Sequence, residues 1–309
     1  MRIVSFERGH IAEAAVLAAT HVTMLRQRLA LVPERWTEAD AYVERLERLI
    51  EGGSAAVALE GGSLVGYLGG FGWQRAGLSN VHSPEWANVS VGERAVEVRQ
   101  QLYAALAERW LADGRTVHYI GLLAHDSAAF EALGWLGFGH SNVDGLRSVA
   151  PVPPGPPIDV TPARPADAHE VLALHLGLRD HLASTPLFLA LEEPISAGDM
   201  AARLEREDEV TLLASDERGP LAFLRIGPAS NDASTIIRDE GTASITGAFT
   251  RPDRRGDGVA TTLLNAALEW ARDQGYVRCS VDWESANLLA TRFWARYFDL
   301  VGISVRRRI

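Results

Sequence analysis

The chain has 309 residues, 47% of them hydrophobic and 23% charged, which is the composition of a globular protein with one large domain or two ordinary ones. Its formal net charge of −10 argues against nucleic acid or an anionic membrane as a partner. All 30 basic residues are arginine, so mechanisms that need a lysine amine are excluded.

The only cysteine and the N-terminal region indicate where the protein works. Cys279 cannot form an internal disulfide, and it alternates with apolar residues as a buried strand residue does. Glu13 interrupts the most apolar run near the N-terminus, which lacks the basic and apolar regions of a cleavable signal. No apolar run reaches membrane length. We therefore expect a cytoplasmic protein.

The first half of the chain alternates helix and strand patterns. In order, we expect a strand, two helices, a hairpin around Glu60-Gly61-Gly62, a helix that ends at Gly114 and a further strand. Apart from the helix before Gly114, these elements cover residues 3–6, 11–29, 37–50, 55–59 with 64–71, and 117–123.

A proline-rich segment then divides the chain. Residues 151–157 are Pro-Val-Pro-Pro-Gly-Pro-Pro, a sequence that forms neither helix nor central strand and favours a stiff, extended connector. We expect one domain over residues 1–148, a linker over 149–157 and a second domain over 158–309, each of ordinary domain size.

The second half shows a similar order of elements. We expect a strand, two helices, a hairpin, a fourth strand, a helix, a fifth strand, a short helix after Asn287 and a last strand. The ranges are 158–161, 166–182, 196–206, 210–215 with 221–226, 245–250, 259–272, 277–283 and 301–307. This order predicts an α/β fold with a mixed sheet and helices on both faces.

The turn between the fourth strand and its helix carries the strongest chemical signal. It is Arg254-Arg255-Gly256-Asp257-Gly258, and a helix that starts after a glycine turn offers unpaired N–H groups to a phosphate. A Walker loop is excluded because the chain has no lysine. A dinucleotide fingerprint is excluded because Thr261 stands where its third glycine is needed.

Two motifs together resemble one family. The turn, as Arg255-x-x-Gly258-x-Ala260, resembles the pyrophosphate loop of the GNAT acyltransferase superfamily, and Asn287-x-x-Ala290-x-x-Phe293-Trp294 resembles its Asn-x-x-Ala-x-x-Phe-Tyr motif. The resemblance covers most of residues 158–309. It implies an N-acetyltransferase that moves the acetyl group of acetyl-CoA to an amine by direct attack in a ternary complex.

The resemblance also implies which residues bind acetyl-CoA. Amides of the turn and of the helix start would hold the pyrophosphate, the end of the fourth strand would pair with the pantetheine arm and supply an oxyanion donor, and Asn287 would bond the arm. The expected residues are Ala248, Phe249, Thr250, Arg255, Gly256, Asp257, Gly258, Val259, Ala260, Thr261, Asn287, Phe293 and Trp294.

Proton transfer is less well defined. A free amine acceptor needs a base near neutral pH, and Glu284 is our first candidate and Asp282 our second, although both could equally be structural. Trp294 replaces the tyrosine that usually protonates the thiolate, which leaves Tyr297 or water as the acid.

The two halves also repeat one another at an offset of 161 residues. Asp126 falls opposite Asn287, while Glu97 and Arg99 fall opposite Gly258 and Ala260. A carboxylate at the pyrophosphate position would repel phosphate. We therefore expect two tandem GNAT-like domains, of which the first is degenerate and binds no acetyl-CoA or binds it poorly.

The acceptor remains open between a small-molecule and a peptide amine. We expect recognition by residues 175–189, with Trp73, His82, Glu85 and Trp86 of the first half as a further wall. No metal motif is found, because His169 and His175 are too far apart to share a helix face. A mycothiol-synthase-like enzyme and a non-catalytic acetyl-CoA sensor stay as alternatives, and the sequence leaves open whether the chain forms a homodimer.

Overall fold

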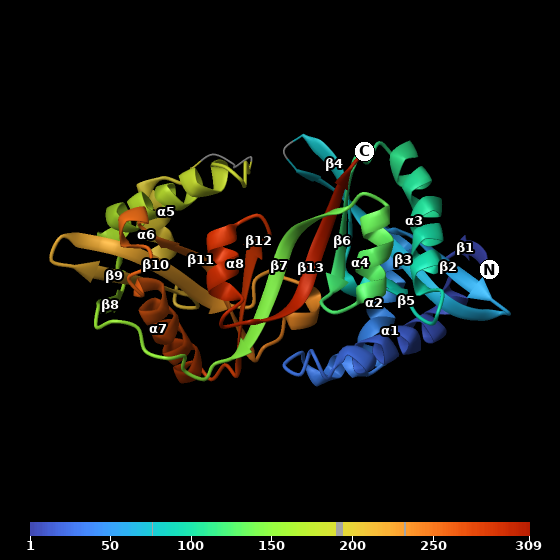
Figure 1. Ribbon diagram of the computed structural model, residues 1–309, viewed down its shortest axis with the longest axis horizontal. Coiled ribbons are helices and arrows are strands. Elements are labelled where there is room, and N and C mark those ends of the chain that lie inside the picture. The colour runs from blue at the N-terminus through green and yellow to red at the C-terminus, as the bar shows by residue number, and fades with distance from the viewer. Residues whose placement is uncertain (76, 190–193, 232) are drawn as a thin grey trace. The chain divides into compact units, whose positions relative to one another are not determined.

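The computed structural model describes residues 1–75, 77–189, 194–231 and 233–309, and their contacts divide the chain into two compact units (Figure 1). Unit 1 contains residues 1–144, 234–237 and 300–309, and unit 2 contains residues 145–233 and 238–299. Each unit combines a mixed sheet with helices, which confirms the predicted α/β class.

Unit 1 is built on strands in the order β1-β2-β3-β4-β6-β13, with β5 paired to β3. The pairs are antiparallel except β4 with β6, which is parallel. Its elements are β1 (Arg2–Ser5), α1 (Ile11–Leu25), α2 (Asp40–Gly52), β2 (Ser54–Glu60), β3 (Ser63–Arg75), β4 (Leu78–Ser83), β5 (Asn88–Ser90), α3 (Ala95–Ala112), β6 (Val117–Leu123), α4 (Ser127–Trp135), the first part of β7 (Gly139–Ser148) and β13 (Asp299–Arg308), with 3₁₀ turns at Arg8–His10, Glu34–Thr37, Glu85–Ala87 and Thr235–Ile237.

Unit 2 repeats this plan with the strand order β12-β11-β10-β9-β8, and the end of β7 lies beside β12. Only β11 and β12 are parallel among the pairs from β8 to β12. Its elements are β8 (Asp159–Pro162), α5 (Ala168–Ala183), α6 (Ala197–Leu204), β9 (Val210–Asp216), β10 (Gly219–Pro228), β11 (Thr242–Thr250), α7 (Val259–Asp273), β12 (Arg278–Glu284) and α8 (Leu288–Trp294), with 3₁₀ turns at Pro165–Asp167 and Pro252–Arg254.

The units differ from the predicted halves in their last strands. Strand β13 lies at the end of the chain, yet it pairs antiparallel with β6, from Gly302 opposite Leu123 to Arg308 opposite Val117. Residues 300–309 therefore complete the sheet of unit 1, while residues 145–148 of β7 belong to unit 2. The predicted division into domains of residues 1–148 and 158–309, joined by a linker of residues 149–157, stays a prediction.

The repeat of 161 residues is present in the folded elements. Strands β6 and β12 start 161 residues apart, and so do helices α4 and α8. The helices before these strands end in the same way, because Gly114 after α3 and Gly275 after α7 adopt left-handed conformations with φ of 73° and 83°. Such a conformation favours glycine and ends a helix.

Two helix boundaries in unit 1 differ by three residues or more from the sequence-based prediction. Helix α1 ends at Leu25 rather than residue 29, because Arg26 and Leu29 donate to carbonyls three residues back and tighten the chain into turns. Helix α2 begins at Asp40, since Thr37 belongs to a 3₁₀ turn in which its hydroxyl donates to Glu34 O at 2.8 Å.

The sheet of unit 2 is covered on both faces. Helices α5 and α6 pack on the face that carries Phe223 and Phe249, and these residues form one buried cluster with Val171, Leu174 and Met200. Helix α7 packs on β9, β10 and β11 from the other side (Figure 1). The buried apolar residues of α7 recur at helical spacing, from Val259 through Leu263, Leu264, Ala267 and Leu268 to Ala271.

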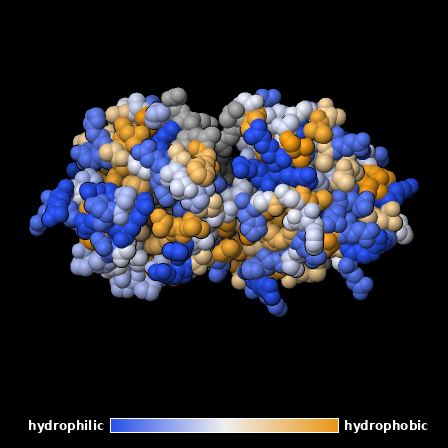
Figure 2. Space-filling view, turned by 45° about the horizontal axis from the view of Figure 1, so that its top comes forward, coloured by the Kyte–Doolittle hydropathy of each residue, from blue (hydrophilic) through white to orange (hydrophobic). Residues whose placement is uncertain are grey.

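Hydrophilic side chains cover much of the face drawn in Figure 2, and apolar side chains lie between them in several separate groups. The exposed large apolar side chains include Trp135 at the end of α4 and the adjacent Leu288 and Leu289 of α8. In the described part of the chain, no helix is both long and apolar enough to cross a membrane.

Candidate functional site

Strands β11 and β12 diverge and open a wedge in unit 2. They pair over only four residues, from Thr242 opposite Arg278 to Ile245 opposite Val281. Beyond this point β11 continues to Thr250, and no described residue pairs with it on the β12 side. A wedge of this kind exposes one edge of β11 to a ligand that offers its own amide groups.

A buried arginine holds the start of the wedge. The register of β10 and β11 shifts at Arg225, and Thr246 is left unpaired in the bulge. The Arg225 guanidinium donates to Thr246 Oγ1 from Nε and to Thr246 O from Nη2, both at 2.9 Å. Burial, reinforced by the positive charge of Arg203, lowers the pKa of Arg225 to about 10. This arginine fixes the shape of the bulge.

The glycine turn closes the wide end of the wedge. Gly256 and Gly258 have φ of 93° and 81°, and Gly258 is the N-cap of α7. The amide of Thr261 donates to Gly258 O at 3.0 Å, whereas the amides from Gly256 to Ala260 donate to no described residue. Five N–H groups at a helix start therefore remain for an anion.

The two arginines of the turn have different roles. Arg254 forms ion pairs with Asp216 and with Asp257, the latter at 3.1 Å, and so holds the outside of the turn. Arg255 donates from Nε to Thr250 O at 3.2 Å and lies over the Phe249 ring. Because no ion pair neutralises Arg255 in the described part of the chain, its charge adds to the anion-binding character of the turn.

The wedge and the turn enclose a pocket of about 310 Å³. It contains twelve of the thirteen residues expected to bind acetyl-CoA; only the exposed Asp257 lies outside it. The residues that the sequence did not single out for this pocket are Leu178, His181, Phe223, Leu224, Arg254, Leu263, Leu289, Ala290 and Arg296. Most of these are apolar residues whose periodicity alone predicts only a core position.

Asn287 and the aromatic residues of α8 form the opposite wall. Asn287 caps the helix by accepting the Ala290 N–H at 3.2 Å, and the Nε2 atom of His181 lies 3.3 Å from the same oxygen. Trp294 is 7% exposed and contacts Phe293 edge-to-face, with ring centroids 4.7 Å apart. The motif that resembles the family's therefore lines the pocket.

The candidate proton-transfer residues lie outside this pocket. Neither Asp282 nor Glu284 of β12 lines it, although both have interactions with other residues. Tyr297 also lies outside the lining, and its hydroxyl is 3.3 Å from Thr261 Oγ1 in the first turn of α7. Their catalytic roles remain proposals.

The proline-rich segment is held against α7. Three α7 side chains bond its backbone: Thr262 Oγ1 donates to Pro156 O at 2.9 Å, Asn265 accepts from Val152 N at 2.9 Å and donates to Pro153 O at 3.3 Å, and Arg272 donates to Val149 O at 2.6 Å. A Cβ on Gly258 would lie 2.6 Å from Pro156 Cδ. The segment thus braces the helix that carries the glycine turn.

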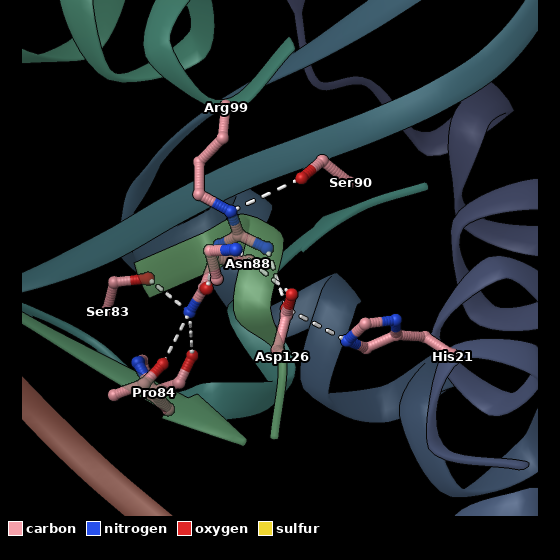
Figure 3. A network of polar contacts seen from close by, with 9 residues as sticks. His21, Ser83, Pro84, Asn88, Ser90, Arg99 and Asp126 are labelled. Carbon is pink, nitrogen blue, oxygen red and sulfur yellow. Dashed lines mark hydrogen bonds and ion pairs between the residues drawn. The ribbon is translucent and has the colours of Figure 1, made fainter. Parts of the chain in front are cut away.

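Unit 1 has a buried polar network at the position that corresponds to the pocket (Figure 3). Arg99, which corresponds to Ala260, is 2% exposed and donates to Ser90 Oγ at 3.2 Å and to Asn88 Oδ1 at 2.5 Å. Its Nη2 lies 3.4 Å from Asp126 Oδ2, and His21 Nε2 lies 3.1 Å from the same oxygen. The buried guanidinium of Arg99 is therefore bonded by three side chains of unit 1 at the position that corresponds to Ala260.

Other residues that the sequence analysis named are buried in the core. Burial raises the pKa of the Cys279 thiol to about 12, as expected of an unreactive core cysteine. Glu85 and Trp86 are buried in unit 1. Within the described ranges, no three His, Cys, Asp or Glu side chains cluster as metal ligands.

Comparisons with known proteins relate part of the chain to acetyltransferases. A model of the Acetyltransferase (GNAT) family matches residues 177–299. Streptothricin acetyltransferase A of Bacillus subtilis (strain 168) is 28% identical over 98 residues, which are 31% of this chain and 57% of that protein. The chain thus matches little more than half the length of this curated relative.

Two solved structures share the fold. A GCN5-related N-acetyltransferase from Sphaerobacter thermophilus has a TM-score of 0.58 at 14% identity, over 99% of this chain and 95% of that one. A GCN5-related glucosamine N-acetyltransferase region of a fungal multi-domain GH3 β-N-acetylglucosaminidase has a TM-score of 0.51 at 14% identity, over 99% of this chain and 38% of that one.

The chain is a mixed α/β protein of two compact units, and its fold is similar to that of GCN5-related N-acetyltransferases. Residues 177–299 thus resemble the GNAT family, whose members generally use acetyl-CoA as acyl donor.

Proposed function

We propose that unit 2 transfers the acetyl group of acetyl-CoA to an amine acceptor. The observation that carries this proposal is the glycine turn, where Arg255, Gly256, Gly258, Val259 and Ala260 line one pocket. The amides from Gly256 to Ala260 donate to no described residue, and no described carboxylate forms an ion pair with Arg255. These donors fit a pyrophosphate, because amides at a helix start and an arginine both favour anions.

The wedge suits the rest of the donor molecule. The unpaired edge of β11 from Thr246 to Thr250 offers backbone groups that complement the two amides of a pantetheine arm. One N–H of this edge is suited to the oxygen of the thioester, where negative charge develops as the amine attacks. Losing a single donor of this kind typically costs about 10²–10³ in rate.

The reaction needs one proton to leave the amine and one to reach the thiolate. The amine nitrogen forms a bond to the thioester carbon, the carbon–sulfur bond breaks, and the amine proton passes to a base. We retain Glu284 as the first candidate base and Asp282 as the second. Because the Tyr297 hydroxyl contacts Thr261 at the phosphate end of the pocket, we favour water as the proton source for the thiolate.

The acceptor is proposed at the level of an amine. Streptothricin is the first compound to test, since the curated relative is named for it. Small-molecule polyamines and peptide N-termini follow, because the net charge of −10 favours a cationic acceptor over an anionic one.

The first test is titration calorimetry of the full chain with acetyl-CoA, followed by CoA release in the presence of the amine panel. We expect one site per chain, because the buried Arg99 side chain of unit 1 stands at the position that corresponds to Ala260 of the glycine turn. Two sites would refute the single-site assignment. Binding without turnover of any amine would leave the acetyl-CoA sensor as the function.

A variant that blocks the pocket makes the binding test specific. Substituting Gly258 is unsuitable, because its φ of 81° and the nearby Pro156 ring would disturb the turn itself. Ala260→Arg introduces the residue that stands at the corresponding position of unit 1 and should abolish acetyl-CoA binding. Gln274→Arg adds the same charge at an exposed position after α7 and should leave binding unchanged.

The base assignment has its own test once an acceptor is known. Glu284→Gln should slow turnover at neutral pH. The turnover rate should recover as the pH approaches the pKa of the free amine, which is about 10 for an alkyl amine. Asp282→Asn is the matched variant two residues earlier on the same strand. A pH profile of Glu284→Gln that coincides with wild type would remove Glu284 as the base.

A further inference from the structure

We propose that His181 is a positioning residue that fixes the side-chain amide of Asn287 so that its Nδ2 donates to the pantetheine arm of acetyl-CoA. The inference rests on the proposed function of unit 2, and it assigns a role to a residue of α5 that lies outside both family-like motifs. His181 and Asn287 both line the pocket.

The hydrogen bonds of Asn287 settle which way its amide faces. The atom that caps α8 accepts the Ala290 N–H at 3.2 Å, so it must be the oxygen Oδ1. His181 Nε2 lies 3.3 Å from that same oxygen, and because an amide oxygen only accepts, Nε2 must carry the proton. The histidine is thereby held in one tautomer.

This arrangement leaves one donor group unused. Asn287 is 9% exposed, and its Nδ2 donates to no described residue. Both contacts made by the side chain go to Oδ1, one from its own helix and one from α5. With the oxygen anchored twice, the amide cannot flip without losing both bonds, and Nδ2 stays available to a ligand in the pocket.

Unit 1 also pairs a histidine with a helix-capping residue, but there the histidine contacts Oδ2 while the helix amide donates to Oδ1. His21 of α1 lies 3.1 Å from Asp126 Oδ2, and Asp126 caps α4 by accepting the Ala129 N–H at 3.0 Å (Figure 3). There the cap presents a carboxylate oxygen, which the buried Arg99 guanidinium approaches at 3.4 Å. Each unit therefore pairs a histidine with the residue that caps a helix, α4 in unit 1 and α8 in unit 2. In unit 1 the capping side chain, Asp126, accepts from the guanidinium of Arg99. In unit 2 the Nδ2 donor of the capping side chain, Asn287, remains available to a ligand.

The test compares ligands that contain or lack the pantetheine arm. Titration calorimetry of the full chain with CoA and with ADP separates the two contributions. CoA contains both the pantetheine arm and the pyrophosphate, whereas ADP contains the pyrophosphate without the arm. His181→Phe keeps a ring but removes the donor, and we expect the Kd for CoA to rise about tenfold while the Kd for ADP stays unchanged. His181→Gln restores a side-chain donor and should recover CoA binding to within about threefold of wild type.

Two further variants guard against a trivial loss of structure. Asn287→Asp keeps the helix cap and the histidine contact but removes the Nδ2 donor, and it should weaken CoA binding while sparing ADP. His169→Phe changes an exposed histidine of the same helix and should alter neither affinity. Thermal melting confirms that each variant is folded.

Each outcome decides the matter. Selective loss of CoA binding in His181→Phe supports the positioning role. Equal loss of CoA and ADP, or no loss of either, overturns it while the proposed function stands. If wild type binds neither CoA nor ADP, the proposed function fails and the inference fails with it.

Discussion

The buried ion pair of unit 1 gives the most direct prediction about stability. Replacing Arg99 with methionine keeps most of the side-chain volume but removes the charge that faces Asp126. Asp126 is 7% exposed, so its carboxylate would lose a buried counter-charge that solvent cannot replace. Asn88 and Ser90 would lose their guanidinium donor in the same substitution.

The magnitude follows from how well the carboxylate remains satisfied. Breaking a buried pair by removing one partner costs about 3–5 kcal/mol. The Arg99–Asp126 contact of 3.4 Å is longer than a strong charge-assisted bond, and His21 still contacts the carboxylate at 3.1 Å. We therefore expect the lower end, about 3 kcal/mol, which corresponds to a Tm lower by about 6–12 °C for a unit of this size.

The loss should depend on pH in a defined direction. Burial acts to raise the pKa of Asp126, but the hydrogen bond from His21 and the charge of Arg99 outweigh it, and the pKa lies below its usual value. A depressed carboxyl pKa stabilises the fold above the unfolded pKa of about 3.9, and this contribution is lost as pH falls through the folded pKa. The Tm difference between wild type and Arg99→Met should be largest near pH 7 and should narrow toward pH 3.

Differential scanning calorimetry of four proteins tests this reasoning. Arg99→Met should melt well below wild type, and adding Asp126→Asn should restore much of the Tm, since the orphan carboxylate is gone and the helix cap remains. Arg94→Met removes exposed ion pairs to Glu60 and Glu97 and should leave Tm unchanged. The reasoning is refuted if Arg99→Met and Arg94→Met melt alike, or if Asp126→Asn lowers Tm further.

Three further predictions follow from unit 2. A Cβ on Gly155 would lie 2.3 Å from Thr262 Oγ1 and 2.9 Å from Thr262 N, so Gly155→Ala should lower the free energy of unfolding in urea by about 1–3 kcal/mol. Pro154→Ala, at an exposed position, should leave the free energy of unfolding unchanged. Equal urea midpoints for the two variants would mean that the proline-rich segment is not held on α7. Burial, with nearby arginines, lowers the pKa of His175 to about 4, so stability should fall between pH 6.5 and pH 4 as only the unfolded state takes up the proton. The urea midpoint of His175→Phe should drop less than that of wild type between pH 7 and pH 5, and an equal drop would contradict this. Cys279 should resist iodoacetamide at pH 8 in the folded chain and react once unfolded in urea; rapid labelling of the native protein would show that the thiol is accessible.

Several features of the structure were predictable from the sequence because they depend on local interactions. Strand β6 falls on the predicted residues 117–123, because an apolar run bounded by turns needs no information from elsewhere in the chain. The glycine turn and the start of α7 at Val259 were also predictable, since Gly258 adopts a left-handed conformation that few other residues tolerate. Asn287 caps α8 through a bond to an amide three residues away, which is again a local interaction.

The tertiary structure decided what those local elements meet. Strands β7 and β13 occupy the same place in the repeat, so their sequences fit either sheet, and only long-range pairing assigns β13 to β6. The contact of His181 with Asn287 spans 106 residues, and no periodic pattern indicates it. Arg99 was predictable as a departure from the glycine turn, but its burial against Ser90, Asn88 and Asp126 was not. The physical reason is the same in each case: sequence spacing fixes backbone conformation and face, whereas the partner of a side chain depends on segments that only folding brings together.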